Sequence, residues 1–246
     1  MLKKLYEKSH IWFSVSWIIA YCVLLSIGDS LSNVIGIQKS VTLPVALLLS
    51  VVLFFFLKKN DLCKEYGLCR AQIPARKMLY YLPVLVMLTA NLWFGVTMNY
   101  GAVESLLYIA SMLCVGFLEE VIFRGLLFGA MKKENLTAAI IVSSITFGIG
   151  HIINLINGSG AELLPNLLQV IYATAAGFMF VMIYHRSRSL LVCISAHGFF
   201  NAISVFANDN LTSGQRILSC IGLTVITGAY AVYLALATEK ANKNKV

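Results

Sequence analysis

The sequence predicts an all-α fold, a polytopic transmembrane helical bundle of about eight spans with both termini cytoplasmic. Its 246 residues are 59% apolar and only 12% charged, with a mean hydropathy of +0.81. Soluble domains carry roughly 25% charged residues. Apolar runs of about 18 residues or more recur along the chain, and each fits a hydrocarbon core of ~30 Å at 1.5 Å per residue. This composition leaves no room for a sizeable soluble domain.

The apolar runs define the expected spans in order along the chain. Lys3 and Lys4 precede the first run, but no small-x-small cleavage site follows it, so we interpret it as a retained helix and not as a signal peptide. Most of the other runs end or begin at basic residues, as membrane helices do at the cytoplasmic face. We expect spans at roughly 11–28, 41–57, 78–97, 105–131, 136–157, 163–184, 189–207 and 215–237.

The distribution of basic residues predicts the orientation. Of the 19 Lys and Arg residues, sixteen fall on the segments facing one side of these spans, two on the other side (Lys39 and Arg216), and Arg124 lies within a span. The positive-inside rule assigns the basic side, which carries both termini, to the cytoplasm. The net charge of +8 is therefore a sign of membrane topology, and we expect no nucleic-acid partner.

The chain is expected to divide at its longest basic loop. Residues 1–77 form a two-span segment that ends in this cytoplasmic loop, and residues 78–246 form a core whose motifs lie within 105–207. The six cysteines are scattered without metal-ligand spacing, which favours packing roles.

The fourth expected span carries three ionisable residues, Glu119, Glu120 and Arg124. Insertion of each charged side chain at the bilayer centre costs about 3 kcal/mol, so these residues must face a protein interior or a wet cavity. Glu120 and Arg124 share a helix face and are expected to pair. Glu119 is rotated by about 100° and is left without a partner by that pair.

Two further motifs lie on separate spans, Phe147-x-x-x-His151 and His197-x-x-x-Asn201. A carboxylate beside a histidine can activate water, and a second histidine with an asparagine can stabilise an oxyanion. Alternatively, Glu119, His151 and His197 supply the His₂Glu set of a catalytic zinc site. The residue types fit both chemistries.

The same residue types also suggest other functions and other protease classes. Buried ionisable groups also suit a non-enzymatic peptide-binding or bacteriocin-immunity protein, or a proton-coupled transporter. The chain contains no His-Glu-x-x-His and no Gly-x-Gly-Asp motif, and Gly158-Ser159-Gly160 is interpreted as a turn.

Together the three motifs resemble those of the CAAX protease and bacteriocin-processing (CPBP, or Abi) family of intramembrane proteases, which includes the type II CAAX prenyl endopeptidases. The family pattern is Glu-Glu-x-x-x-Arg, Phe-x-x-x-His and His-x-x-x-Asn or Asp on separate helices. It occurs here as Glu119-Glu120-x-x-x-Arg124, Phe147-x-x-x-His151 and His197-x-x-x-Asn201.

The resemblance implies an endopeptidase that hydrolyses a peptide bond of a membrane-associated protein or peptide. It assigns water activation to Glu119 and His151, oxyanion stabilisation to His197 and Asn201, and supporting roles to Glu120, Arg124 and Phe147. It leaves open whether the mechanism uses a metal such as zinc or the glutamate alone. A chain this short resembles a bacterial member in the plasma membrane, acting in peptide maturation, immunity or regulation.

Overall fold

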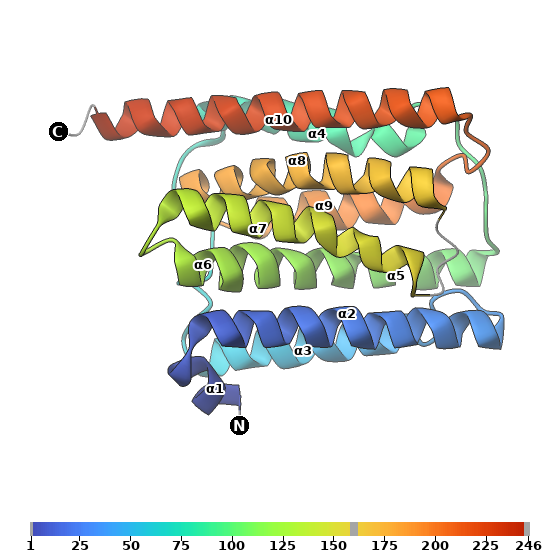
Figure 1. Ribbon diagram of the computed structural model, residues 1–246, viewed down its shortest axis with the longest axis horizontal. Helices are drawn as coiled ribbons and strands as arrows, with labels where there is room; N and C mark the ends of the chain where they lie inside the picture. The colour runs from blue at the N-terminus through green and yellow to red at the C-terminus, as the bar shows by residue number, and fades with distance from the viewer. Residues whose placement is uncertain (1, 158–161, 244–246) are drawn as a thin grey trace.

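The computed structural model describes residues 2–157 and 162–243, and within these ranges the chain is a bundle of helices with no β-strand (Figure 1). The predicted all-α fold is confirmed. The predicted turn at Gly158-Ser159-Gly160 lies outside the described residues. The longer helices are α2 (His10–Ile35), α3 (Thr42–Lys59), α5 (Ala102–Glu119), α7 (Leu136–Gly150), α8 (Leu163–Ser187), α9 (Leu191–Ile203) and α10 (Ser213–Lys243). Short helices are α1 (Leu2–Lys8), α4 (Leu82–Leu88) and α6 (Phe128–Met131), with further helical turns η1 (Ala75–Tyr81), η2 (Ala90–Leu92), η3 (Glu120–Leu127), η4 (His151–Leu155) and η5 (Ser204–Phe206).

Six continuous helical segments among the described residues are long and apolar enough to cross a membrane. The segment Ala102–Met131, which runs from α5 through η3 into α6, is the longest apart from α10 and matches the expected span at 105–131. Outward-facing side chains such as Leu48 and Val225 are apolar and remain 63% and 61% exposed. Such a surface suits contact with lipid tails, because apolar side chains that face hydrocarbon are not exposed to water.

The prediction of one continuous span at 78–97 was wrong. Residues 79–81 have φ values between 48° and 59°, so the helical ladder breaks there and α4 is only seven residues long. The Tyr230 hydroxyl donates a hydrogen bond of 2.6 Å to the carbonyl oxygen of Met78, which replaces a lost helical partner. An interior side chain thus provides a hydrogen bond to a backbone group that would be unsatisfied in lipid. The apolar composition of residues 78–97 alone did not reveal the break.

The expected span at 189–207 is a shorter helix, α9, extended by η5 to Phe206. It packs against α5, α4 and α8 inside the bundle. The predicted count of about eight spans is therefore not confirmed. In Figure 1, α1 and the last turns of α10 lie at the same end of the bundle. Their cytoplasmic location stays a prediction.

Two glycines set the distance between α5 and α9. A Cβ atom added at Gly116 would lie 2.5 Å from the backbone nitrogen of Gly198 and 2.6 Å from its Cα. A real Cβ atom would clash at these distances. The backbones of α5 and α9 are therefore in direct contact at this point, which only a glycine at position 116 allows. Glu119 follows Gly116 by three residues and His197 precedes Gly198, so this contact brings the two helices together where they carry ionisable groups.

Gly116→Ala is expected to destabilise the folded protein by about 1–3 kcal/mol, because the new methyl group meets backbone and not a flexible side chain. Gly228→Ala on α10 is the matched control, since a Cβ there meets nothing within 4 Å. Thermal unfolding in mild detergent is expected to show a lower midpoint temperature for Gly116→Ala and an unchanged midpoint temperature for Gly228→Ala. Equal midpoints for the two variants would contradict the close contact.

Candidate active site

Three buried side chains form an ionic cluster on η3 and α9. Arg124 Nη1 lies 3.0 Å from Glu120 Oε1, which is the ion pair that their spacing predicts. The same oxygen lies 2.8 Å from His197 Nδ1. Glu120 and Arg124 are 0% exposed. Both stand on a π-helical stretch, a wide helical turn that recurs at functional sites. Because Glu120 holds Nδ1, the imidazole of His197 is fixed with Nε2 pointing away from Glu120.

Aromatic rings enclose this cluster. The guanidinium carbon of Arg124 lies 4.0 Å from the ring centroid of Phe147 and 5.4 Å from that of Phe180. The ring of His197 stacks on Phe180 at 5.6 Å and meets the edge of Phe147 at 5.5 Å. Phe147 also contacts His151, with centroids 5.4 Å apart. Phe147 therefore packs against residues from all three motifs, whereas Phe180 carried no motif signal in the sequence.

Glu119, which the Glu120–Arg124 pair leaves without a partner, lies close to residues of two other helices. Tyr21 on α2 donates a hydrogen bond of 2.6 Å to Glu119 Oε1. Glu119 Oε2 lies 3.3 Å from His197 Nε2 but makes no hydrogen bond with any described residue. Sequence reasoning missed Tyr21, because a single tyrosine in an apolar span has no distinguishing pattern. Only the packing of α2 against η3 reveals its role.

The remaining predicted residues line cavities beside the cluster. Glu119, His151 and Asn201 line one of about 330 Å³. His151 and Asn201 also line an adjoining cavity of about 40 Å³ together with His197 and Phe147. No hydrogen bond joins the side chain of His151 or Asn201 to another described residue. The structure thus brings all four predicted catalytic residues to the junction of two cavities, with polar atoms free to bind a ligand or water.

The alternative zinc set was Glu119, His151 and His197. Two members approach one another, since Glu119 Oε2 and His197 Nε2 are 3.3 Å apart. Within residues 2–157 and 162–243, however, no three His, Cys, Asp or Glu side chains gather closely enough to hold a metal ion. The three-residue site therefore does not fit this geometry.

Comparison with known proteins agrees with the geometry. The family model described as type II CAAX prenyl endopeptidase Rce1-like matches residues 101–203. "Putative membrane peptidase YdiL" of Bacillus subtilis is 35% identical over 101 residues, which cover 41% of this chain and 36% of that protein. A "UPF0719 transmembrane protein" of Aquifex aeolicus is 26% identical over 170 residues, covering 64% of this chain and 63% of its own length. No solved structure matches the chain.

Both alignments span less than two thirds of the curated relatives' own lengths. The family match, by contrast, contains every one of the three motifs, from Glu119 to Asn201, and lies on the helices that enclose the ionic cluster. Residues 101–203 of this multi-pass membrane protein are therefore similar to the Rce1-like type II CAAX prenyl endopeptidases.

Proposed function

We propose that the protein is an intramembrane endopeptidase that hydrolyses a peptide bond of a membrane-associated protein or peptide, with Glu119 as general base. The single observation that carries this proposal is the environment of Glu119. One carboxylate oxygen is held by Tyr21, and the other is buried without a hydrogen bond in a cavity shared with His151 and Asn201. A fixed carboxylate with one free oxygen is what a water molecule needs for activation.

His151 completes the water site in this proposal. It lines the same cavity as Glu119 from η4, at the end of α7, and its ring makes no hydrogen bond with another described residue. The water is held between the two groups. Glu119 takes a proton from it as the water oxygen bonds to the carbonyl carbon. Glu119 then returns this proton to the amide nitrogen as the C–N bond breaks, and the second water proton stays on the acyl product, so the products are a carboxylic acid and an amine.

His197 and Asn201 stabilise the oxyanion in this proposal. They stand one turn apart on α9 and both line the smaller cavity. Glu120 fixes the ring of His197 through Nδ1, which leaves Nε2 on the side of Glu119 as a donor. Donors that are fixed before the reaction stabilise developing charge without reorganisation, usually the largest electrostatic contribution in such reactions. Arg124, Glu120 and Phe147 support the site by holding His197.

The orientation is part of the proposal. We place both termini in the cytoplasm of a bacterial cell, because sixteen of the 19 basic residues lie on that side of the predicted spans. The first helix, α1, and the C-terminal turns of α10 lie at one end of the bundle, which is compatible with this placement (Figure 1).

The test is mass spectrometry of small membrane proteins and released peptides from cells that carry wild-type or Glu119→Gln protein at equal abundance. We expect fragments that occur with the wild type alone, and these identify both the substrate and the scissile bond. Identical fragment profiles with both proteins folded would overturn the proposal and favour a peptide-binding protein.

Tyr21→Phe is expected to lower kcat about tenfold at unchanged KM, because Glu119 loses a charge-assisted hydrogen bond that holds it in place. Tyr172→Phe is the matched control, since Tyr172 lines the same cavity without a hydrogen bond to Glu119. Steady-state kinetics with a fragment-derived peptide provide the measurement. A similar fall in kcat for both variants would contradict the positioning role of Tyr21.

A further inference from the structure

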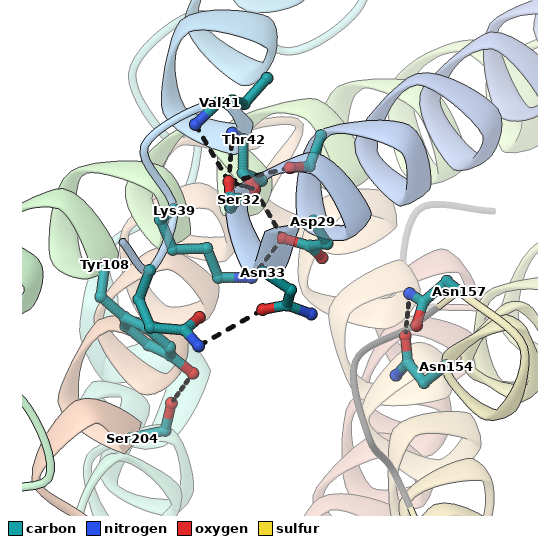
Figure 2. A network of polar contacts seen from close by, with 12 residues as sticks. Asp29, Ser32, Asn33, Lys39, Val41, Thr42, Tyr108, Asn154, Asn157 and Ser204 are labelled. Carbon is teal, nitrogen blue, oxygen red and sulfur yellow. Dashed lines mark hydrogen bonds and ion pairs between the residues drawn. The ribbon is translucent and has the colours of Figure 1, made fainter. Parts of the chain in front are cut away.

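The lining of the larger cavity includes, besides Glu119, an ion pair between Asp29 on α2 and Lys39 in the turn that leads to α3. Lys39 Nζ lies 2.7 Å from Asp29 Oδ1, and both residues line the cavity that also contains Glu119 (Figure 2). Their side chains are only 15% and 18% exposed. Among the described residues, Lys39 is the one Lys or Arg that lines this cavity.

The turn that carries Lys39 is fixed to its neighbours independently of the lysine. Lys39 has φ 62°, a left-handed conformation that residues with a side chain rarely adopt. The backbone nitrogen of Gln38 donates to Glu104 Oε1 at 2.9 Å, which attaches the turn to α5. The backbone nitrogens of Val41 and Thr42 donate to Ser32 Oγ on α2 (Figure 2). The backbone that carries Lys39 is therefore held in place without the ion pair, and Asp29 holds the ammonium group at the cavity.

The ion pair is not needed to hold this turn to α2. Thr42 Oγ1 already donates a hydrogen bond of 2.6 Å to Asp29 Oδ1, in addition to the contacts with Ser32. An ammonium group has three N–H donors, and Asp29 takes one of them. The others are available on the side of the cavity, where the ring of Tyr108 lies 5.7 Å from Nζ.

The charges that line the cavity define what Lys39 can bind. The other charged side chains in the lining are the carboxylates of Asp29 and Glu119. An anion in this cavity is repelled by the two carboxylates and attracted by Lys39, beside which it completes a carboxylate–ammonium–carboxylate arrangement. The partial burial of the pair keeps this attraction from being fully screened by salt.

We propose that Lys39 binds a carboxylate of the polypeptide substrate and so selects which bond reaches Glu119; this inference rests on the proposed function. Tyr21, which holds Glu119, and Asp29, which holds Lys39, are separated by eight residues of α2, roughly 12 Å along the helix. An extended peptide covers this distance in about three to four residues. The carboxylate therefore lies about that number of residues from the scissile bond, as an Asp or Glu side chain or as a free C-terminus.

In the experiment, the purified protein in detergent is incubated with a library of peptides from a chymotryptic protein digest. One half of the library is untreated, and in the other half every carboxylate is amidated. Mass spectrometry then identifies the newly formed peptide termini. We expect the wild type to cleave carboxylate-bearing peptides about tenfold faster than amidated ones, the effect of losing a charge-assisted contact. Untreated peptides without Asp or Glu distinguish the sources, because they carry only the C-terminal carboxylate.

Lys39→Gln is expected to abolish this preference and Lys39→Arg to retain it. Asp29→Asn/Lys39→Gln is included because it leaves no unpaired buried carboxylate if the single variant folds poorly. Arg216→Gln is the matched control, because Arg216 is in the first turn of α10, which lies at the same end of the bundle as the turn between α2 and α3 (Figure 1), and it does not line this cavity. A preference that survives in Lys39→Gln or the double variant, or that is lost equally in Arg216→Gln, overturns the assignment. Absence of any cleavage that depends on Glu119 instead overturns the proposed function.

Discussion

Glu119→Gln is expected to lower kcat by about 10²–10⁴-fold, the range that positioned general bases contribute. The amide group of the glutamine cannot take a proton from water, although it has the same shape as the carboxylate of Glu119. Its oxygen can still accept the hydrogen bond from Tyr21, which spans 2.6 Å in the structure. Its nitrogen replaces an oxygen that lies 3.3 Å from His197 Nε2 and makes no hydrogen bond with a described residue. The substitution therefore removes the base and keeps the hydrogen bond from Tyr21.

Turnover of a peptide identified in cells provides the measurement, with thermal unfolding as the check on folding. Glu134→Gln is the matched control, because Glu134 is exposed just beyond α6 and does not line the cavity. The control is expected to keep full activity. A Glu119→Gln protein with normal turnover would remove the basis of the proposed mechanism.

Breaking the buried ion pair is expected to have the largest effect on stability. Arg124→Met leaves the carboxylate of Glu120, which is 0% exposed, with His197 as its remaining partner. Glu120→Gln leaves the guanidinium of Arg124 buried without a countercharge. Each single change is expected to lower the free energy of unfolding by about 3–5 kcal/mol, because an uncompensated charge stays in a low-dielectric interior.

The double variant Glu120→Gln/Arg124→Met is expected to cost less than the sum of the two single changes, since it removes both charges together. Glu7→Gln is the control for the pairing geometry. Lys3 and Glu7 share the same four-residue spacing at 3.8 Å but are 67% and 60% exposed, so the change is expected to cost less than about 1 kcal/mol. Unfolding curves in detergent measure all four proteins. Equal costs for the exposed and buried pairs would contradict the role of burial.

Most of the bundle could be predicted from the sequence because lipid imposes simple constraints. A segment that crosses the bilayer needs length and apolar side chains, and both can be counted. The segment at 78–97 satisfied that count and yet breaks at residues 79–81. Its carbonyl groups find partners such as Tyr230 inside the protein, and a hydropathy profile contains no information on such partners.

The four predicted catalytic residues could likewise be chosen from the sequence, since ionisable groups are costly in a membrane and the three motifs stand at helical spacings. Their partners could not. Tyr21 is 98 positions from Glu119. The contact exists because α2 packs against η3, and the surfaces of two packed helices are not encoded in the spacing of either one.

By itself, the sequence determined that the chain is a helical membrane protein and which ionisable residues must be shielded from lipid, because both follow from the local cost of placing groups in hydrocarbon. Only the tertiary structure decided how those residues are joined. The contact of Gly116 with Gly198 brings His197 to both glutamates, and α2 adds Tyr21 and Asp29 to the same cavity. These contacts depend on which helix faces which, and that is fixed by packing over the whole bundle.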